Sequence, residues 1–308
     1  NLIARALSKR ESRTIGVIAP ESSDGYFTRI MRGVETAMLH AGYLYFTTSH
    51  LGRAELTREY PNALIQRGVD GLIFVNTRMH EAPGVPAVCI SDSCKLEGVT
   101  SVVVDQREGM FRAMEHLAAL GHRRILMMRG SEWSLDADDR YAAMVQAAQQ
   151  LGLPVTPELT LTLETNQLSP EMAYRAMKEF LEPPLDFTAV FAFNDIAALG
   201  ALRAMQDVGL RCPQDVSVLG VDDISTAAYV FPRLSSCAQP LEAMGAAAVE
   251  HLVARIQRPQ EPHPPRVLFP MTLKIRESTG PAPAVHQPRH RTPARPVDHL
   301  SPVAFHPA

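Results

Sequence analysis

Short apolar runs alternate with amphipathic segments along most of this chain. Eight runs are apolar on consecutive residues and often β-branched, which predicts parallel strands covered on both faces. They span residues 14–19, 44–48, 72–75, 87–90, 101–104, 125–128, 189–192 and 216–221. The stretches between them repeat apolar positions with a helical period, near residues 27–40, 54–66, 107–120, 138–150, 170–181, 195–208 and 240–256. This alternation predicts an α/β protein.

Four of the predicted helices stop at a glycine that is soon followed by a strand: Gly42, Gly121, Gly152 and Gly209. Glycine adopts the left-handed conformation that closes a helix at little cost, so each glycine is expected to mark a helix end. The strand pattern runs to Asp105 and then restarts, which predicts two lobes. Ligands of such sheets bind beyond the carboxyl ends of the strands, so two facing lobes would form a ligand cleft.

Composition adds limits on location and chemistry. The 308 residues are 46% hydrophobic with a formal charge of −3, and no apolar run reaches the length of about 20 residues that spans a bilayer. Residues 1–14 are basic and polar and lack the apolar stretch of a secretory signal. The four cysteines form no C-x-x-C pair, so we expect free thiols and a cytoplasmic protein.

The C-terminal segment has a different composition. Residues 280–308 hold seven prolines and four scattered histidines without a periodic apolar pattern. Such a segment cannot bury enough surface to offset its ordering entropy, so we expect it to be disordered. We predict no metal site and no cofactor, because neither phosphate-binding glycine motif is present and no metal-ligand spacing is found.

Six short motifs occur in order along the chain: VDGLIF (69–74), HL followed by LGHRRI (116–125), FND followed by ALGALRA (193–204), DVSV followed by GVDDI (215–224), PRLSS followed by QP (232–240), and REST (276–279). Together with the N-terminal NLIARAL, they resemble the LacI/GalR family of transcription regulators. The resemblance covers residues 1–279 and implies two doubly wound parallel-sheet lobes like those of periplasmic binding proteins. It implies an N-terminal lobe of 14–108 plus 240–266 and a C-terminal lobe of 109–239 plus 267–279.

The same resemblance assigns residues 1–13 to a hinge helix that follows a helix-turn-helix headpiece, which this chain lacks. Ala4, Arg5 and Leu7 would then contact DNA, since an apolar wedge can enter the minor groove while basic neighbours neutralise phosphates. Taken alone, the segment could equally be a solvated basic tail.

Eight residues are candidates for a ligand site at the ends of strands or in first helical turns: Tyr26, Phe27, Asp92, Trp133, Arg140, Asn194, Asp222 and Gln239. An aromatic face covers a sugar ring, and carboxylates, an amide and a guanidinium bind its hydroxyls. Tyr26 and Phe27 could instead be core side chains. Asp195 and Asp223 are expected to cap helices.

These observations favour a repressor whose core binds a small effector, most simply a sugar, and controls operator binding allosterically. The resemblance implies a homodimer or a dimer-based tetramer, to which helices 27–40 and 57–66 would contribute. Two alternatives remain. One is a periplasmic sugar-binding protein of a transporter, and the other is a glycosidase that uses Asp92 and Asp222, whose carboxyl groups would have to lie about 5 Å apart.

Overall fold

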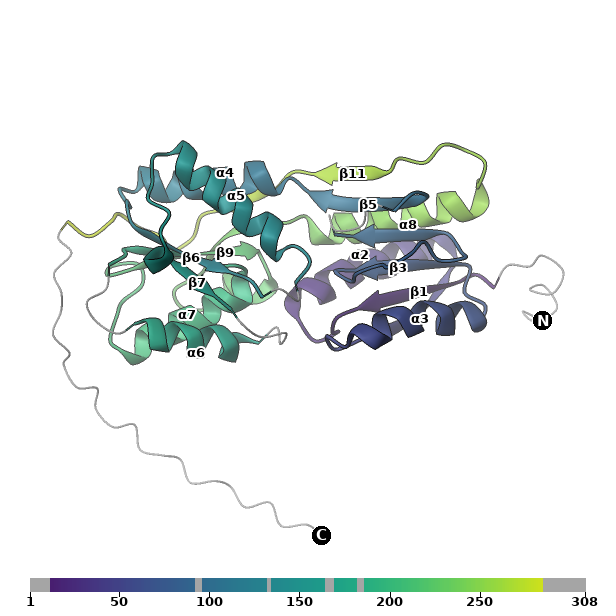
Figure 1. The fold of residues 1–308 in the computed structure, drawn as a ribbon, viewed down its shortest axis with the longest axis horizontal. Coiled ribbons are helices and arrows are strands. Elements are labelled where there is room, and N and C mark those ends of the chain that lie inside the picture. The colour runs from purple at the N-terminus through teal and green to yellow at the C-terminus, as the bar shows by residue number, and fades with distance from the viewer. Residues whose placement is uncertain (1–11, 92–95, 132–133, 164–168, 182–185, 285–308) are drawn as a thin grey trace, which may run out of the picture.

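The computed structural model describes residues 12–91, 96–131, 134–163, 169–181 and 186–284. Within these residues the chain forms two α/β lobes that lie end to end along the long axis of the molecule (Figure 1). The eight predicted strands and the seven predicted helices are all present, with ends that differ from the prediction by a few residues at most. The two-lobed α/β fold expected from the sequence is therefore confirmed.

The N-terminal lobe is a six-stranded parallel sheet in the order β11-β5-β4-β3-β1-β2. Its strands are β1 (Thr14–Ala19), β2 (Leu44–Ser49), β3 (Gly71–Val75), β4 (Ala87–Ile90), β5 (Val99–Val104) and β11 (Arg266–Phe269). Helices α2 (Gly25–Ala41) and α8 (Leu241–Gln257) pack on one face, and α3 (Ala54–Gln66) packs on the other. Each face of the sheet thus has its own apolar core.

The C-terminal lobe repeats this plan with the strand order β12-β10-β9-β8-β6-β7. Its strands are β6 (Ile125–Arg129), β7 (Thr160–Thr162), β8 (Ala189–Phe191), β9 (Ser217–Asp222), β10 (Ser235–Ala238) and β12 (Thr272–Lys274). All neighbours are parallel except β12, which runs antiparallel to β10. Helices α4 (Gln106–Ala119) and α5 (Ala137–Gln150) cover one face, and α6 (Pro170–Phe180) and α7 (Asp195–Asp207) cover the other.

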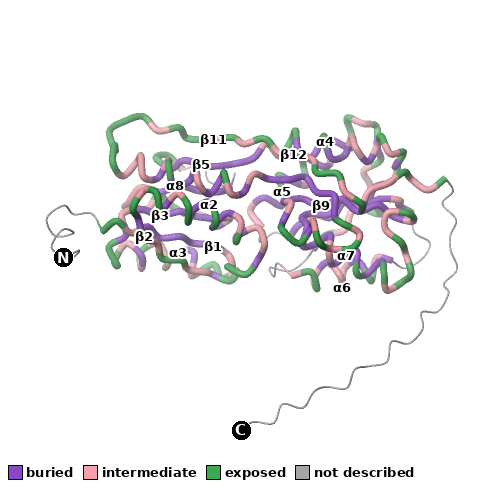
Figure 2. Tube along the Cα trace, turned by 180° about the vertical axis from the view of Figure 1, so that it is seen from behind, coloured by how far each residue is buried: buried purple, intermediate pink, exposed green. Residues whose placement is uncertain are grey.

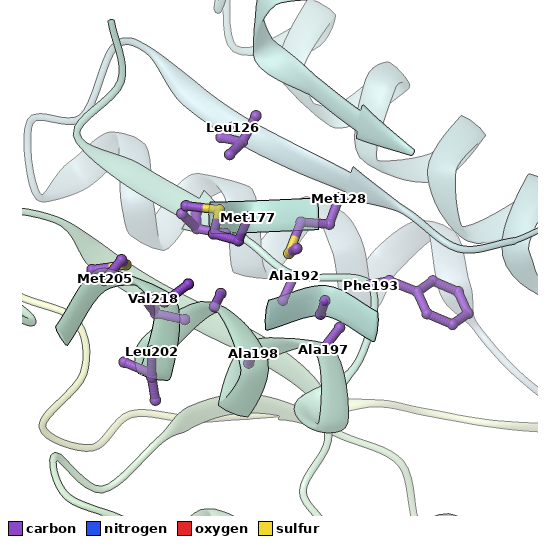
Figure 3. Packing of buried hydrophobic residues seen from close by; sticks show 14 of the residues in the cluster. Leu126, Met128, Met177, Ala192, Phe193, Ala197, Ala198, Leu202, Met205 and Val218 are labelled. Atoms are coloured by element: carbon purple, nitrogen blue, oxygen red, sulfur yellow. The ribbon is translucent and has the colours of Figure 1, made fainter. Parts of the chain in front are cut away.

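Two 3-10 turns, Pro157–Leu159 and Ser225–Ala228, complete the described elements. The core between β6, β8 and β9 on one side and α6 and α7 on the other is built from small and flexible side chains, including Met128, Met177 and Ala198 (Figure 3). In the tube view the central strands of both sheets are buried, whereas the edge strands β2, β7, β11 and β12 are partly exposed (Figure 2). This distribution explains why consecutive apolar residues marked the strands.

β11 belongs to the N-terminal sheet, because it pairs with β5 over its whole length, from Arg266 to Phe269. α4 begins at Gln106 and packs against α5 and β12 of the C-terminal lobe.

The contact between α2 and α8 requires glycine on both helices. A Cβ atom at Gly33 would lie 1.9 Å from the carbonyl oxygen of Glu242, and one at Gly245 would lie 2.2 Å from that of Ile30. The two backbones therefore approach closely along this line. The four glycines predicted to end helices all have positive φ, which confirms that prediction.

The described cysteines, Cys89, Cys212 and Cys237, form no disulfide bond. Among the described residues, no group of three histidine, cysteine or acidic side chains is arranged to hold a metal ion. In the same part of the chain, no helix combines the length and the apolar character that crossing a membrane requires. The hinge residues Ala4, Arg5 and Leu7, the ligand candidates Asp92 and Trp133, and most of the C-terminal segment lie outside the described residues.

Candidate functional site

Several of the described ligand candidates, from both lobes, meet where the lobes join. The side chain of Asp222 contacts those of Arg140 and Gln239, and the phenol of Tyr26 lies close enough to Arg140 and Asp222 for their charges to act on it. Tyr26 comes from α2 of the N-terminal lobe, whereas Arg140 and Asp222 come from α5 and β9 of the C-terminal lobe. These residues, together with Asn194, are called the junction cluster below.

Arg140 is fixed in the first turn of α5 by three different kinds of contact. Its Nη1 donates to the carbonyl oxygen of Phe193 at 2.9 Å, and its Nε donates to Oε1 of Gln106 at 3.3 Å. The guanidinium also lies 4.8 Å from the centroid of the Phe193 ring, in a cation–π arrangement. Figure 3 shows that ring extending away from the other labelled core side chains. Arg140 is 3% exposed, so its charge is held at a defined position inside the junction.

Asp222 ends β9 and is the second buried charge. Gln239 Nε2 donates to its Oδ1 at 2.7 Å, and Nη2 of Arg140 lies 4.0 Å from the same oxygen. Burial raises the pKa of Asp222 to about 7, against the opposing effects of Arg140 and Gln239. The carboxyl group is therefore divided between its two protonation states near neutral pH.

The backbone at the end of β9 is strained. Asp222 has φ of 107° and Asp223 has φ of 54°, and neither residue is glycine. Such conformations cost about 1–3 kcal/mol each and persist only where the surroundings enforce them. Two hydrogen bonds within the C-terminal lobe help to hold this turn. Ile224 N donates to Asp195 Oδ2 at 2.8 Å, and Asp223 N donates to Ser236 Oγ at 3.0 Å.

The expectation that Asp195 and Asp223 cap helices is wrong. The N-cap of α7 is Asn194, whose Oδ1 accepts a hydrogen bond from Ala197 N at 2.8 Å. Asp195 lies one residue further on and points into the lobe, where it accepts from Ser236 Oγ at 2.7 Å. Asp223 instead pairs with Arg276, with Oδ1 and Nη2 2.6 Å apart. Oδ1 of Asn194 is therefore engaged by the helix that it caps.

Glycine at position 220 makes room for Asp195. A Cβ atom there would lie 2.2 Å from Asp195 Oδ1, so any other residue would displace this carboxyl group. Asp195 is fully buried, and burial, followed by the charge of Asp222, raises its pKa well above the ordinary value. Asp195 therefore holds the strained turn and does not face a ligand.

The two aromatic candidates have different surroundings. Phe27 is 5% exposed and belongs to the core between α2, α8 and the sheet, which is the alternative left open by the sequence. Tyr26 is only partly buried in that core and reaches the junction. Burial, followed by the charges of Asp136 and Asp222, raises the pKa of its phenol well above the ordinary value. Tyr26 therefore stays protonated and can donate a hydrogen bond.

Sequence reasoning missed Asp24, Asp136 and Gln106. Asp24 is 7% exposed and caps α2, with its side chain accepting from Phe27 N, and burial raises its pKa to about 6. Its place just before an amphipathic helix is an N-cap signature that could have identified the capping role. Asp136 is 9% exposed and acts electrostatically on both Tyr26 and Asp222. Around Arg140 the described residues thus place several buried carboxyl groups.

Comparison with known proteins identifies the fold and its relatives. Residues 114–279 match the family model of the periplasmic binding protein-like domain. The HTH-type transcriptional repressor PurR of Erwinia tasmaniensis is 31% identical over 283 residues, which cover 89% of this chain and 82% of that protein.

Solved structures agree with this assignment. A LacI family transcriptional regulator from Enterococcus faecium with bound ribose superposes with a TM-score of 0.77 at 29% identity, covering 87% of this chain and 99% of that one. A putative transcriptional regulator of the same family from Sanguibacter keddieii gives a TM-score of 0.79 at 29% identity, over 88% of this chain and 99% of that one.

Proposed function

Because this chain belongs to the LacI/GalR family of transcription regulators, we propose that a small neutral polar effector, most simply a sugar, binds at the junction cluster and controls operator binding. The observation that carries the proposal is the meeting of Tyr26 from one lobe with Arg140 and Asp222 from the other. A ligand that contacts all three bridges the lobes. Its binding energy therefore depends on how the lobes are oriented, which is the requirement for allosteric control.

The chemistry of the cluster favours a ligand with hydroxyl groups. Arg140 supplies donors in a rigid plane, Asp222 accepts from hydroxyls, and the amide of Asn194 and the phenol of Tyr26 can each donate. Asp24 and Asp136 add further carboxyl groups beside a single buried guanidinium among the described residues. An anionic ligand such as a sugar phosphate would face this negative charge, so a neutral polyol fits better.

A thermal-shift screen against neutral sugars, nucleosides and sugar phosphates tests the proposal. A ligand that binds only the folded state raises the melting temperature, by an amount equivalent to about 2.7 kcal/mol at one hundred times its dissociation constant. The shift should be lost in Arg140→Ala and Asp222→Ala and retained in Arg175→Ala, an exposed arginine on α6. A shift that survives both junction variants would place the ligand elsewhere.

We also propose that the protein acts in the cytoplasm as a homodimer on a palindromic operator, through residues 1–13 and a headpiece that precedes them. Large apolar side chains lie exposed along one edge of the N-terminal lobe: Leu39 is 80% exposed, Leu44 73% and Phe46 50%. Exposed apolar patches of this kind mark protein interfaces. Sedimentation at micromolar concentration should show a dimer that Phe46→Glu weakens. A monomeric wild type would refute the proposed dimer.

A transporter-linked binding protein and a glycosidase are the competing functions. If the protein were a transporter-linked binding protein, it would form no dimer, and its full-length form would bind no operator DNA. The second depends on Asp92, which lies outside the described residues, and on turnover of chromogenic glycosides. Relatives that are transcriptional regulators support binding without hydrolysis.

A further inference from the structure

One arginine of the N-terminal lobe contacts the strained turn of the C-terminal lobe. Nη1 of Arg29, on α2, donates to the carbonyl oxygen of Asp223 at 2.6 Å. This oxygen belongs to the residue that follows Asp222, the carboxylate of the junction cluster. The hydrogen bond therefore runs directly from one lobe to the other, beside the segments where the chain itself crosses between them.

Arg29 is held on its own lobe by a second contact. Its Nε lies 3.5 Å from Oε1 of Glu242, in the first turn of α8, and the Arg29 side chain is only 27% exposed. The same guanidinium thus joins α2, α8 and the Asp223 carbonyl group. A planar guanidinium with several fixed donors is suited to such a three-way contact, whereas a single ammonium group is not.

The turn meets the N-terminal lobe at a second point. Ile224 packs against Gly25, so that a Cβ atom at Gly25 would lie 3.0 Å from the Cβ atom of Ile224. On the C-terminal side, Asp195 accepts from Ile224 N, and Arg276 binds the Asp223 carboxylate. The turn is therefore held from both lobes, and its N-terminal contacts exist only when the lobes are together.

We propose that Arg29 is a positioning residue that ties the placement of Asp222 to closure of the two lobes. When the lobes are together, Arg29 holds the carbonyl group of Asp223 and so fixes the turn that presents the Asp222 carboxylate to an effector. When the lobes separate, this hydrogen bond breaks and the turn keeps only its C-terminal contacts. The role of Asp222 toward an effector rests on the proposed function, whereas the contact of Arg29 with the turn does not.

Disulfide trapping measures closure without any effector. Gly25→Cys with Ile224→Cys places two Cβ atoms slightly nearer than the roughly 3.5–4.5 Å found across disulfides, so a small adjustment allows the bond. Oxidised glutathione would supply the oxidant, and mass spectrometry of the linked peptides would separate this bond from those of the native cysteines. The rate of trapping then reports how often the lobes meet at this turn.

The trapping rate is compared in three backgrounds: Arg29, Arg29→Gln and Arg32→Gln. Arg32 is an exposed arginine on the same helix and serves as the matched control. We expect Arg29→Gln to slow trapping roughly tenfold, because a charge-assisted hydrogen bond between the lobes is lost, and Arg32→Gln to leave the rate unchanged. Glu242→Gln removes the ion pair that holds Arg29 and should reduce the trapping rate by a smaller factor. It tests the same contact if Arg29→Gln folds poorly.

Two results would overturn the proposal. One is a trapping rate in folded Arg29→Gln equal to that in Arg32→Gln, which would mean that Arg29 does not bias closure. The other is the absence of trapping even with Arg29 present, which would mean that the lobes do not meet at this turn. Failure of the effector screen would affect neither result, so the two proposals can be refuted separately.

Discussion

Replacing Asp222 with asparagine should stabilise the fold at alkaline pH while removing effector binding. Asparagine has nearly the same shape as the protonated acid, and its oxygen can still accept from Gln239 Nε2. The substitution therefore removes only the ionised form. That form is the unfavourable one in this environment, because Asp222 is 3% exposed and its pKa is raised to about 7.

The size of the effect follows from the difference in pKa between the two states. Asp222 has a pKa of about 7 in the fold, against 3.8 as the ordinary value. The folded state therefore binds more protons between these two values, so the stability of the wild type increases as the pH falls through 7. The ionised carboxylate costs up to roughly 4 kcal/mol above pH 7, and roughly 2.5 kcal/mol of that is recovered on going from pH 8 to pH 5. Asparagine at this position has no such dependence.

Melting temperatures of the wild type and Asp222→Asn at pH 5, 6.5 and 8 test this reasoning. The advantage of the variant should be about 1.5 kcal/mol at pH 5 and widen to about 4 kcal/mol at pH 8, which is a further several degrees in melting temperature. Asp138→Asn, at a side chain that is 75% exposed, is the control and should change stability by less than about 0.5 kcal/mol. A difference that stays constant across this range would refute the reasoning, since it would mean that Asp222 ionises alike in the folded and unfolded chain.

Two further substitutions test packing and the buried histidine. Gly245→Ala should destabilise the protein by about 3 kcal/mol or more, because its Cβ atom would meet a backbone oxygen of α2, whereas Gly84→Ala has open space and should be nearly neutral in thermal unfolding. His122→Phe should cost about 2–4 kcal/mol through loss of its bonds to Thr188, Ser217 and the Gly280 carbonyl group. Burial lowers the pKa of His122, so the fold favours the neutral imidazole. The stabilisation by His122 is therefore complete above about pH 6.5 and is lost as the pH falls below that value. The variant should lose stability less steeply than the wild type on acidification, as followed by circular dichroism.

Most of the fold could be predicted because its strands are buried on both faces. The residues of β3 and β5 are all buried, and such strands are apolar on consecutive residues, a pattern that helices of this length do not show. The strands that escaped prediction are short, and three of them lie at sheet edges: β7, β11 and β12. β10 is internal but reads Ser-Ser-Cys-Ala, because its serines bond side chains of neighbouring segments instead of forming an apolar core.

The site was harder to predict because side-chain roles depend on one-residue offsets. Asn194 and Asp195 are adjacent, yet one caps α7 and the other is buried beneath the β9 turn. Both residue types favour caps, so only the position where the helix begins separates them. Tyr26 and Phe27 show the same difficulty, since one helical step decides which ring reaches the junction and which joins the core.

Several unfavourable features of this structure meet at the turn after β9, where protonation, the proposed ligand binding and lobe closure are linked. Asp222 combines a positive φ with a buried carboxyl group whose pKa is about 7, and Arg29 of the other lobe bonds the next residue. A ligand that donates hydrogen bonds to Asp222 prefers the carboxylate, so its affinity should fall up to about tenfold per pH unit below pH 7 and level off above it. Calorimetric titration of a ligand found in the screen, at pH 6 and pH 8, should show this difference together with proton release at pH 6. Equal affinities at the two pH values would mean that the ligand does not donate hydrogen bonds to the Asp222 carboxylate.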